Sequence, residues 1–171
     1  MAKTGTYTQI ATTTISGTST VTYTFASIPQ TYTDLVLVCN AKSSAGAAMA
    51  VRPNGSTGTY SGTYINGPGN AAVATSQRRS NATNSFLYIG YNYNMSSTVG
   101  GVAVANFMDY ANTTTYKTVL SKYNITSLGV EAGANLWQST AAISSLEVWC
   151  NSPYYWVAGT TFTLYGIEAY K

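Results

Sequence analysis

Residues able to perform acid–base or nucleophilic chemistry are scarce in this chain. It contains no histidine and only five carboxylates, which are Asp34, Asp109, Glu131, Glu147 and Glu168. A catalytic triad or an activated cysteine needs an imidazole partner. Glycoside hydrolysis needs two facing carboxylates, which only the tertiary fold could bring together here. The sequence also lacks P-loop, GxGxxG and HExxH motifs. We therefore expect a protein that is not an enzyme and binds no cofactor.

The two cysteines, Cys39 and Cys150, each end an apolar run. Cysteine is among the residue types most often buried, so both are predicted core positions. Without histidine, two cysteines are too few ligands for a structural zinc site, and we expect no metal. Reduced thiols are the expected state in a protein made in a cytoplasm, although the sequence leaves a disulfide between them open.

The overall composition favours surfaces that form contacts. Only 8% of the residues are charged, against about 25% in typical soluble domains. Threonine, serine, asparagine and 15 tyrosines take their place. Few charges must then be desolvated when subunits associate, which suits permanent assembly.

Two classes of partner are not expected. The 8 basic residues are scattered, and Arg78-Arg79 is the only adjacent pair, so no nucleic-acid face is indicated. No apolar run approaches the roughly 18 residues of a membrane span, so no membrane insertion is expected. The first residues also lack the apolar segment of a signal peptide.

Two aromatic groups are candidate contact residues. Tyr154, Tyr155 and Trp156 follow a proline in a predicted loop, and Tyr91 and Tyr93 flank an asparagine after a predicted strand. Exposed rings beside neutral hydrogen-bonding groups can hold glycans. Alternatively, these rings fill the ends of the fold or a subunit interface, where tyrosine and tryptophan are enriched.

The elements that must position these residues are predicted to be strands almost throughout. Residues 20–25 alternate threonine with apolar side chains, and residues 35–39 are apolar on both faces, as in a central strand. Similar runs cover residues 7–15, 86–89, 102–108, 117–123, 142–150 and 160–168. We expect an all-β single domain over residues 1–171, with about nine or ten strands in a two-sheet antiparallel β-sandwich of jelly-roll type. Residues 1–6 are expected to form a short N-terminal arm.

One long stretch, about residues 54–84, is rich in glycine, serine, threonine and asparagine. It carries further candidate contact residues, Tyr60, Tyr64, Arg78 and Arg79. We expect a long loop, since loops of this length are often functional. It is either an arm that touches a neighbour or receptor, or a surface hairpin with short strands near residues 59–65.

Three segments resemble a family of tailed-phage virion structural proteins, frequent in marine and cyanobacterial phages. They are Phe25-Ala-Ser-Ile-Pro-Gln-Thr-Tyr-Thr-Asp-Leu35, Asn54-Gly-Ser-Thr-Gly-Thr-Tyr-Ser61 and Gly159-Thr-Thr-Phe-Thr-Leu-Tyr-Gly-Ile167. The resemblance spans nearly the whole chain, and its Ile-Pro-x-Thr-Tyr-x-Asp-Leu and Phe-Thr-Leu-Tyr-Gly-Ile strings are distinctive. Thr160 stands where the closing motif usually has serine. The resemblance carries no catalytic residues.

The composition and this resemblance together favour a virion structural protein, made in the host cytoplasm and assembled on the particle. We expect a capsid decoration (cement) protein, a homotrimer that binds the major capsid protein and bridges capsomers. The alternative is a receptor-binding adhesin of a tail fibre or head fibre that recognises host polysaccharide.

Overall fold

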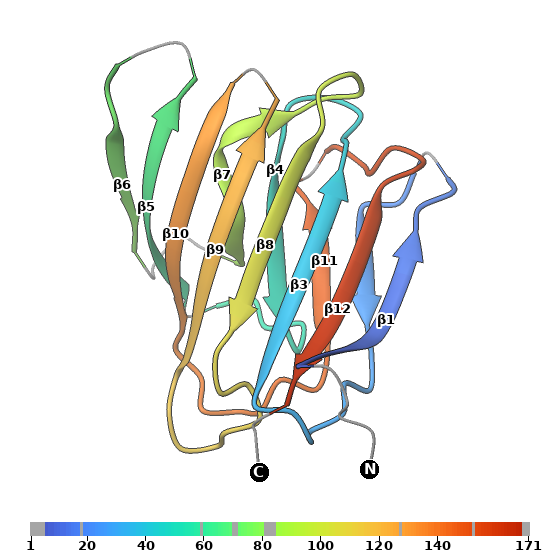
Figure 1. The fold of residues 1–171 in the computed structure, drawn as a ribbon, viewed down its shortest axis with the longest axis vertical. Helices are drawn as coiled ribbons and strands as arrows, with labels where there is room; N and C mark the ends of the chain where they lie inside the picture. The colour runs from blue at the N-terminus through green and yellow to red at the C-terminus, as the bar shows by residue number, and fades with distance from the viewer. Residues whose placement is uncertain are drawn as a thin grey trace.

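The computed structural model describes residues 6–17, 19–58, 60–69, 72–80, 85–126, 128–151 and 153–168. The expected arm over residues 1–6 lies outside these ranges except for Thr6. The described residues form twelve strands and no helix (Figure 1). The strands are β1 (Tyr7–Thr14), β2 (Thr22–Phe25), β3 (Asp34–Ala41), β4 (Ala47–Pro53), β5 (Tyr60–Pro68), β6 (Thr75–Arg79), β7 (Leu87–Met95), β8 (Gly101–Phe107), β9 (Lys117–Ile125), β10 (Gly129–Trp137), β11 (Leu146–Cys150) and β12 (Thr161–Ile167).

These strands form an antiparallel β-sandwich with jelly-roll topology, as the sequence predicts. The large sheet has the order β1-β12-β3-β8-β9-β10-β5-β6, and the small sheet has the order β2-β11-β4-β7. The first strand pairs with the last, β2 pairs with β11, β3 with β8 and β4 with β7. This is the pairing of an eight-strand jelly roll, in which one long antiparallel hairpin is folded so that its successive strand pairs alternate between the two sheets. The hairpins β5–β6 and β9–β10 are insertions that widen the large sheet.

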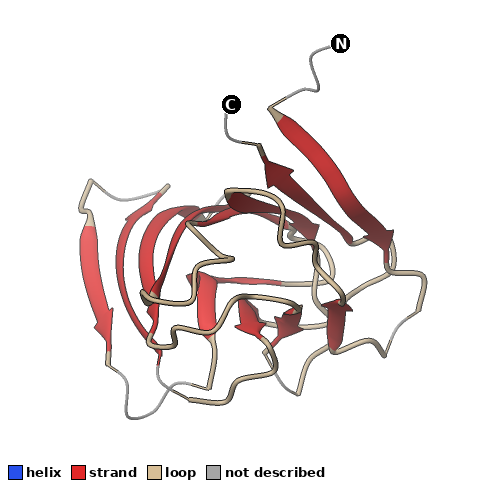
Figure 2. Cartoon of the chain, turned by 90° about the horizontal axis from the view of Figure 1, so that it is seen from below, coloured by secondary structure: helices blue, strands red, loops and turns tan. Residues whose placement is uncertain are grey.

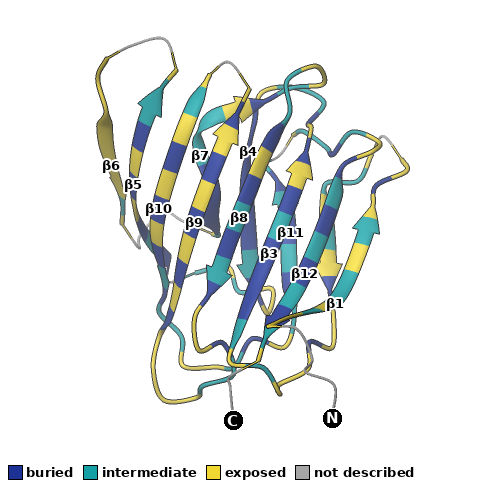
Figure 3. Ribbon diagram, viewed as in Figure 1, coloured by how far each residue is buried: buried dark blue, intermediate teal, exposed yellow. Residues whose placement is uncertain are grey.

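Alternating side chains build the core between the two sheets. Along β9 and β10, buried and exposed residues alternate strictly over most of each strand, as Figure 3 shows. The expected central strand is β3, whose Leu35, Leu37 and Cys39 join one buried cluster with residues of the small sheet. On its other face Val36 is buried and Val38 is half-buried.

The widened sheet curves, as seen from below in Figure 2, so that β5, β9 and β10 all contact β7 of the small sheet. Glycines permit the closest approaches. A Cβ on Gly90 of β7 would lie 2.7 Å from the ring of Tyr123 of β9. The glycine therefore leaves room for a tyrosine ring between the sheets.

The expectation of a long loop over residues 54–84 is wrong. β5 and β6 occupy much of that stretch and pair as a hairpin, with Gly62 opposite Arg79. This is the hairpin alternative, although its strands are longer than expected. All but the last residue of β6 is exposed, so the strand has no apolar face that a sequence pattern could reveal. β4 and β10 were also not predicted, since both contain alanine or glycine where a strand pattern needs larger side chains.

Candidate interaction surface

The segment Tyr154-Tyr155-Trp156 does not form an exposed platform. Trp156 is fully buried, with its ring centroid 5.1 Å from that of Phe162. The backbone N–H of Tyr155 donates to Ser44 Oγ (3.2 Å), and Tyr154 is half-buried against the core. The segment closes one end of the sandwich, so the glycan-platform expectation is wrong for Trp156.

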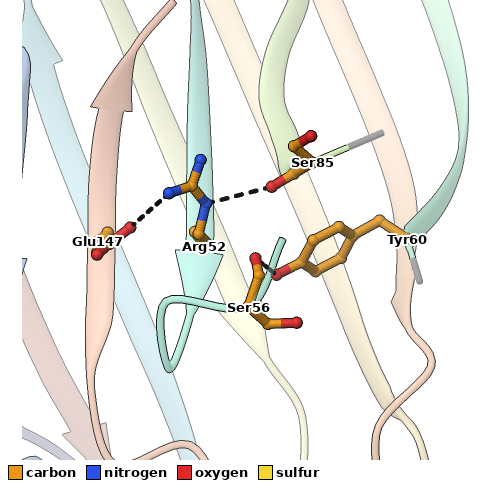
Figure 4. Close-up of polar contacts among 5 residues, drawn as sticks. All are labelled: Arg52, Ser56, Tyr60, Ser85 and Glu147. Carbon is orange, nitrogen blue, oxygen red and sulfur yellow. Dashed lines mark hydrogen bonds and ion pairs between the residues drawn. The ribbon is translucent and has the colours of Figure 1, made fainter. Parts of the chain in front are cut away.

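Tyr60 and Tyr64 are also buried rather than displayed. The Tyr60 hydroxyl donates to the carbonyl oxygen of Ser56 (2.8 Å; Figure 4), and burial raises the pKa of Tyr60 to about 12. The Tyr64 hydroxyl donates to Asn135 Oδ1 (2.6 Å), and burial raises the pKa of Tyr64 well above its ordinary value. Both hydroxyls hold loops and strands together, and neither is available to an external ligand.

Five rings follow one another across the outer face of the small sheet and the edge of β5. This outer aromatic cluster consists of Trp149, Phe86, Tyr88, Tyr91 and Tyr64, with successive centroids 4.8, 4.9, 4.8 and 5.2 Å apart. Ala50 of β4 lies between Trp149 and Tyr88 in the sheet register. The small side chains of β4 therefore leave space for the large rings on either side.

Two arginines cover the outer aromatic cluster. The Arg79 guanidinium lies 4.7 Å from the Tyr88 ring centroid and 4.8 Å from that of Tyr91. Arg52 lies 4.7 Å from the Trp149 ring centroid, and its Nη1 is 3.2 Å from Glu147 Oε2 (Figure 4). These cation–π contacts already occupy ring faces on which a sugar would stack.

Of the residues predicted from the sequence, the structure therefore brings Tyr64, Arg79 and Tyr91 together. It places them with Tyr88, Phe86 and Trp149, which the sequence did not mark as contact residues. Arg78, in contrast, is exposed on β6.

Tyr93 belongs to an irregular part of β7. The register between β4 and β7 shifts between Ala47 opposite Met95 and Met49 opposite Gly90, so β7 bulges there. Burial and the nearby charge of Glu131 raise the pKa of Tyr93, which is half-buried. Tyr93 therefore packs partly against the core cluster rather than standing free on the surface.

An exposed apolar surface that the sequence did not reveal lies on the outer face of the large sheet. It consists of Ile65 of β5, Val102 of β8, Leu120 of β9 and Val130 of β10, which we call the outer-face patch. Ile65 and Val130 are 61% and 60% exposed. A groove of about 630 Å³ runs along this surface, and Val130 and Ile65 line it. Lys122 is the only charged residue among the outward-facing positions of these four strands.

The remaining chemically active groups have structural contacts. Asp34 Oδ1 accepts the N–H of Asp109 (2.7 Å), and Glu147 pairs with Arg52. Within the described ranges, no group of three or more histidine, cysteine or acidic residues could hold a metal ion. Cys39 and Cys150 are buried free thiols, and burial raises the pKa of Cys150 to about 12.

No helix in the described part of the chain is long and apolar enough to cross a membrane. No protein-family model, curated protein or solved structure matches this chain. The jelly roll, the outer-face patch and the contacts of individual side chains are therefore the observations on which a function can be argued.

Proposed function

We propose that the protein is a non-enzymatic virion structural protein of a tailed phage, and specifically a capsid decoration protein that bridges capsomers. The outer-face patch is the observation that carries this proposal. Contiguous exposed apolar surface marks interaction sites, and within this patch Ile65 and Val130 are 61% and 60% exposed and Val102 and Leu120 are both 42% exposed. The partners are further copies of this chain, in a homotrimer, and the major capsid protein.

The charge of this surface supports a permanent contact. Lys122 is the only charged side chain that faces outward from β5, β8, β9 and β10. Burying threonine, alanine and valine against a partner requires little desolvation of charge. The strands that display the outer-face patch are hydrogen-bonded on both sides, so the surface loses little conformational freedom when it docks.

Two of the phage-like sequence strings lie next to each other in the fold. The N–H of Thr33, in the first string, donates to the carbonyl oxygen of Ile167, in the closing string (2.8 Å). Gly166 of the closing string also pairs with Leu35 of the first string, between β12 and β3. The two strings therefore specify one part of the sandwich, as expected for residues that maintain a scaffold rather than a catalytic site.

The proposal is tested by placing a charge in the outer-face patch. Val130→Glu and Ile65→Glu are each expected to weaken co-sedimentation with undecorated capsids at least tenfold, because an unpaired carboxylate would be buried on docking. Thr14→Glu, at an exposed position on β1, is the control and should bind as the original protein does. Equal binding by all three variants, with unchanged melting temperatures, would contradict the proposal.

Imaging of the labelled protein in intact particles provides an independent test. A decoration protein should appear over the head at high copy number. A signal confined to the tail would refute a role in bridging capsomers.

A further inference from the structure

A second pocket, which we call the end pocket, lies where β3 and β9 end and β8 begins. These strand ends lie at the end of the sandwich opposite the start of β1 and the end of β12 (Figure 1). Its volume of about 370 Å³ falls within the range of about 300–1,000 Å³ that is typical of ligand sites. Its lining residues are Asn40, Lys42, Thr98, Val99, Gly100, Val102, Asn124 and Thr126.

One wall of the end pocket is fixed through the backbone of Lys42. The N–H of Lys42 donates to Thr160 Oγ1 (3.1 Å), and the carbonyl oxygen of Lys42 accepts the N–H of Val157 (2.9 Å). A Cβ on Gly100 would lie 3.3 Å from the Lys42 side chain, so the glycine lets the loop before β8 approach closely. The wall is therefore positioned before any ligand arrives.

The opposite wall is held in a similar way. In the loop between β7 and β8, the N–H of Val99 donates to Ser96 Oγ (3.0 Å), and the N–H of Ser96 donates to the Val99 carbonyl oxygen (2.9 Å). Asn124 Oδ1 accepts the N–H of Val102 (3.3 Å), which fixes the amide and leaves its two N–H donors for other partners.

The lining of the end pocket offers donors and one positive charge. The Lys42 ammonium has no hydrogen-bond or ion-pair partner among the described residues. Asn40, Thr98 and Thr126 add neutral amide and hydroxyl groups, and no acidic residue among the described ones lines the pocket. This arrangement is complementary to an anion that also carries many hydroxyl groups.

We propose that the end pocket binds a carboxylated sugar unit of an acidic polysaccharide. Lys42 pairs with the carboxylate, and the asparagine and threonine side chains hydrogen-bond to the hydroxyls. The aliphatic side chain of Val99 lies against the apolar face of the sugar ring, whereas Val102 belongs to the outer-face patch. Neutral hydrogen-bonding side chains outnumber the single cation, which favours a saccharide over an acidic peptide. The inference goes beyond the proposed assembly role and does not depend on it.

Isothermal titration calorimetry with sodium polygalacturonate tests this proposal on the full chain. We expect binding that weakens with salt, and a Kd raised at least tenfold by Lys42→Gln. Arg78→Gln removes the same charge from an exposed position on β6 and is the matched control, with a Kd within twofold of the original. Neutral dextran should not bind.

Three outcomes would overturn the proposal. The first is no binding of polygalacturonate, and the second is an equal effect of Lys42→Gln and Arg78→Gln. The third is equally tight binding of polyglutamate, which would show that the pocket recognises negative charge alone. Val130→Glu distinguishes this site from the assembly surface, since it should weaken capsid binding while Lys42→Gln leaves capsid binding unchanged.

Discussion

Glu131 shows how a carboxylate can serve the fold of this protein rather than a reaction. Its side chain is buried and accepts the backbone N–H groups of Tyr91 (2.8 Å) and Asn92 (2.9 Å). It also accepts the side-chain amide of Asn92. These backbone donors come from the bulge in β7, where the ladder to β4 is interrupted. A charged acceptor on β10 therefore satisfies groups that would otherwise be buried without partners.

Replacing Glu131 with glutamine is expected to reduce the free energy of unfolding by about 2 kcal/mol, because a hydrogen bond to a charged group contributes about 1.5–3 kcal/mol. Urea denaturation followed by tryptophan fluorescence measures this change. Glu168→Gln, at an exposed position near the end of β12, should change stability by less than about 0.5 kcal/mol. If the two variants lose the same stability, Glu131 does not have the role assigned to it.

The sequence did not show which of the candidate contact residues are exposed. Trp156 follows a proline and two tyrosines, and this pattern is the same whether the ring faces water or closes the sandwich. Arg79 lies on β6 of the large sheet and Tyr91 on β7 of the small sheet, so the sequence does not show that they meet. The absence of histidine, by contrast, is a property of composition and needs no structure.

At the scale of elements, glycines on one segment leave space for tyrosine rings from another. Gly166 of β12 lies beneath Tyr32 from the loop before β3, and a Cβ there would lie 2.3 Å from the ring. Tyr32 in turn packs against the core cluster. The loop is therefore seated on the sheet at a position where any larger residue would displace it.

We expect Gly166→Ala to lower the free energy of unfolding by about 1–3 kcal/mol, since the added methyl overpacks the Tyr32 contact. Gly17→Ala is the matched control, because no atom lies within 4 Å of a Cβ built there. Thermal unfolding measures both variants. In a double-mutant cycle, Tyr32→Ala should remove most of the additional loss that Gly166→Ala causes. An equal loss with and without Tyr32 would exclude the contact as the cause.

The sequence pattern predicts strands correctly where apolar alternation is strong and misses them where it is weak. β2, β3 and β12 were predicted because phenylalanine, tyrosine and leucine mark their inner faces. β8 was predicted from its valines, although these face outward and Val102 belongs to the outer-face patch. β4 was missed since its alanines face both the core and the outer aromatic cluster. β6 was missed because it is a polar edge strand, and its exposed Arg78 also discourages pairing with other chains.

At the scale of the whole molecule, the reactivity of the two thiols shows whether the two sheets are packed together. Cys39 lies on the inner face of β3 and Cys150 on that of β11, and each is 0% exposed. Burial raises the pKa of both thiols, so little thiolate forms at neutral pH. Neither thiol can react unless the sandwich opens.

We expect no reaction of the native protein with an aromatic disulfide reagent at pH 8, and reaction of two thiols per chain in denaturant. At intermediate urea concentrations, both thiols should be labelled at the rate at which the whole sandwich opens. Absorbance of the released chromophore measures this rate. Fast labelling of one cysteine in the absence of denaturant would show that its sheet opens separately.

The position of the two chain ends has a mechanical consequence. β1 and β12 are antiparallel neighbours, with Tyr7 opposite Ile167, so the start of β1 and the end of β12 lie at the same end of the sandwich (Figure 1). A force that pulled the termini apart would load the hydrogen bonds between these strands one pair at a time, and the sheet would unzip from that end. A tether through the termini would therefore fail at low force. In the proposed decoration role, contacts spread across the sheet faces would share a load among many bonds.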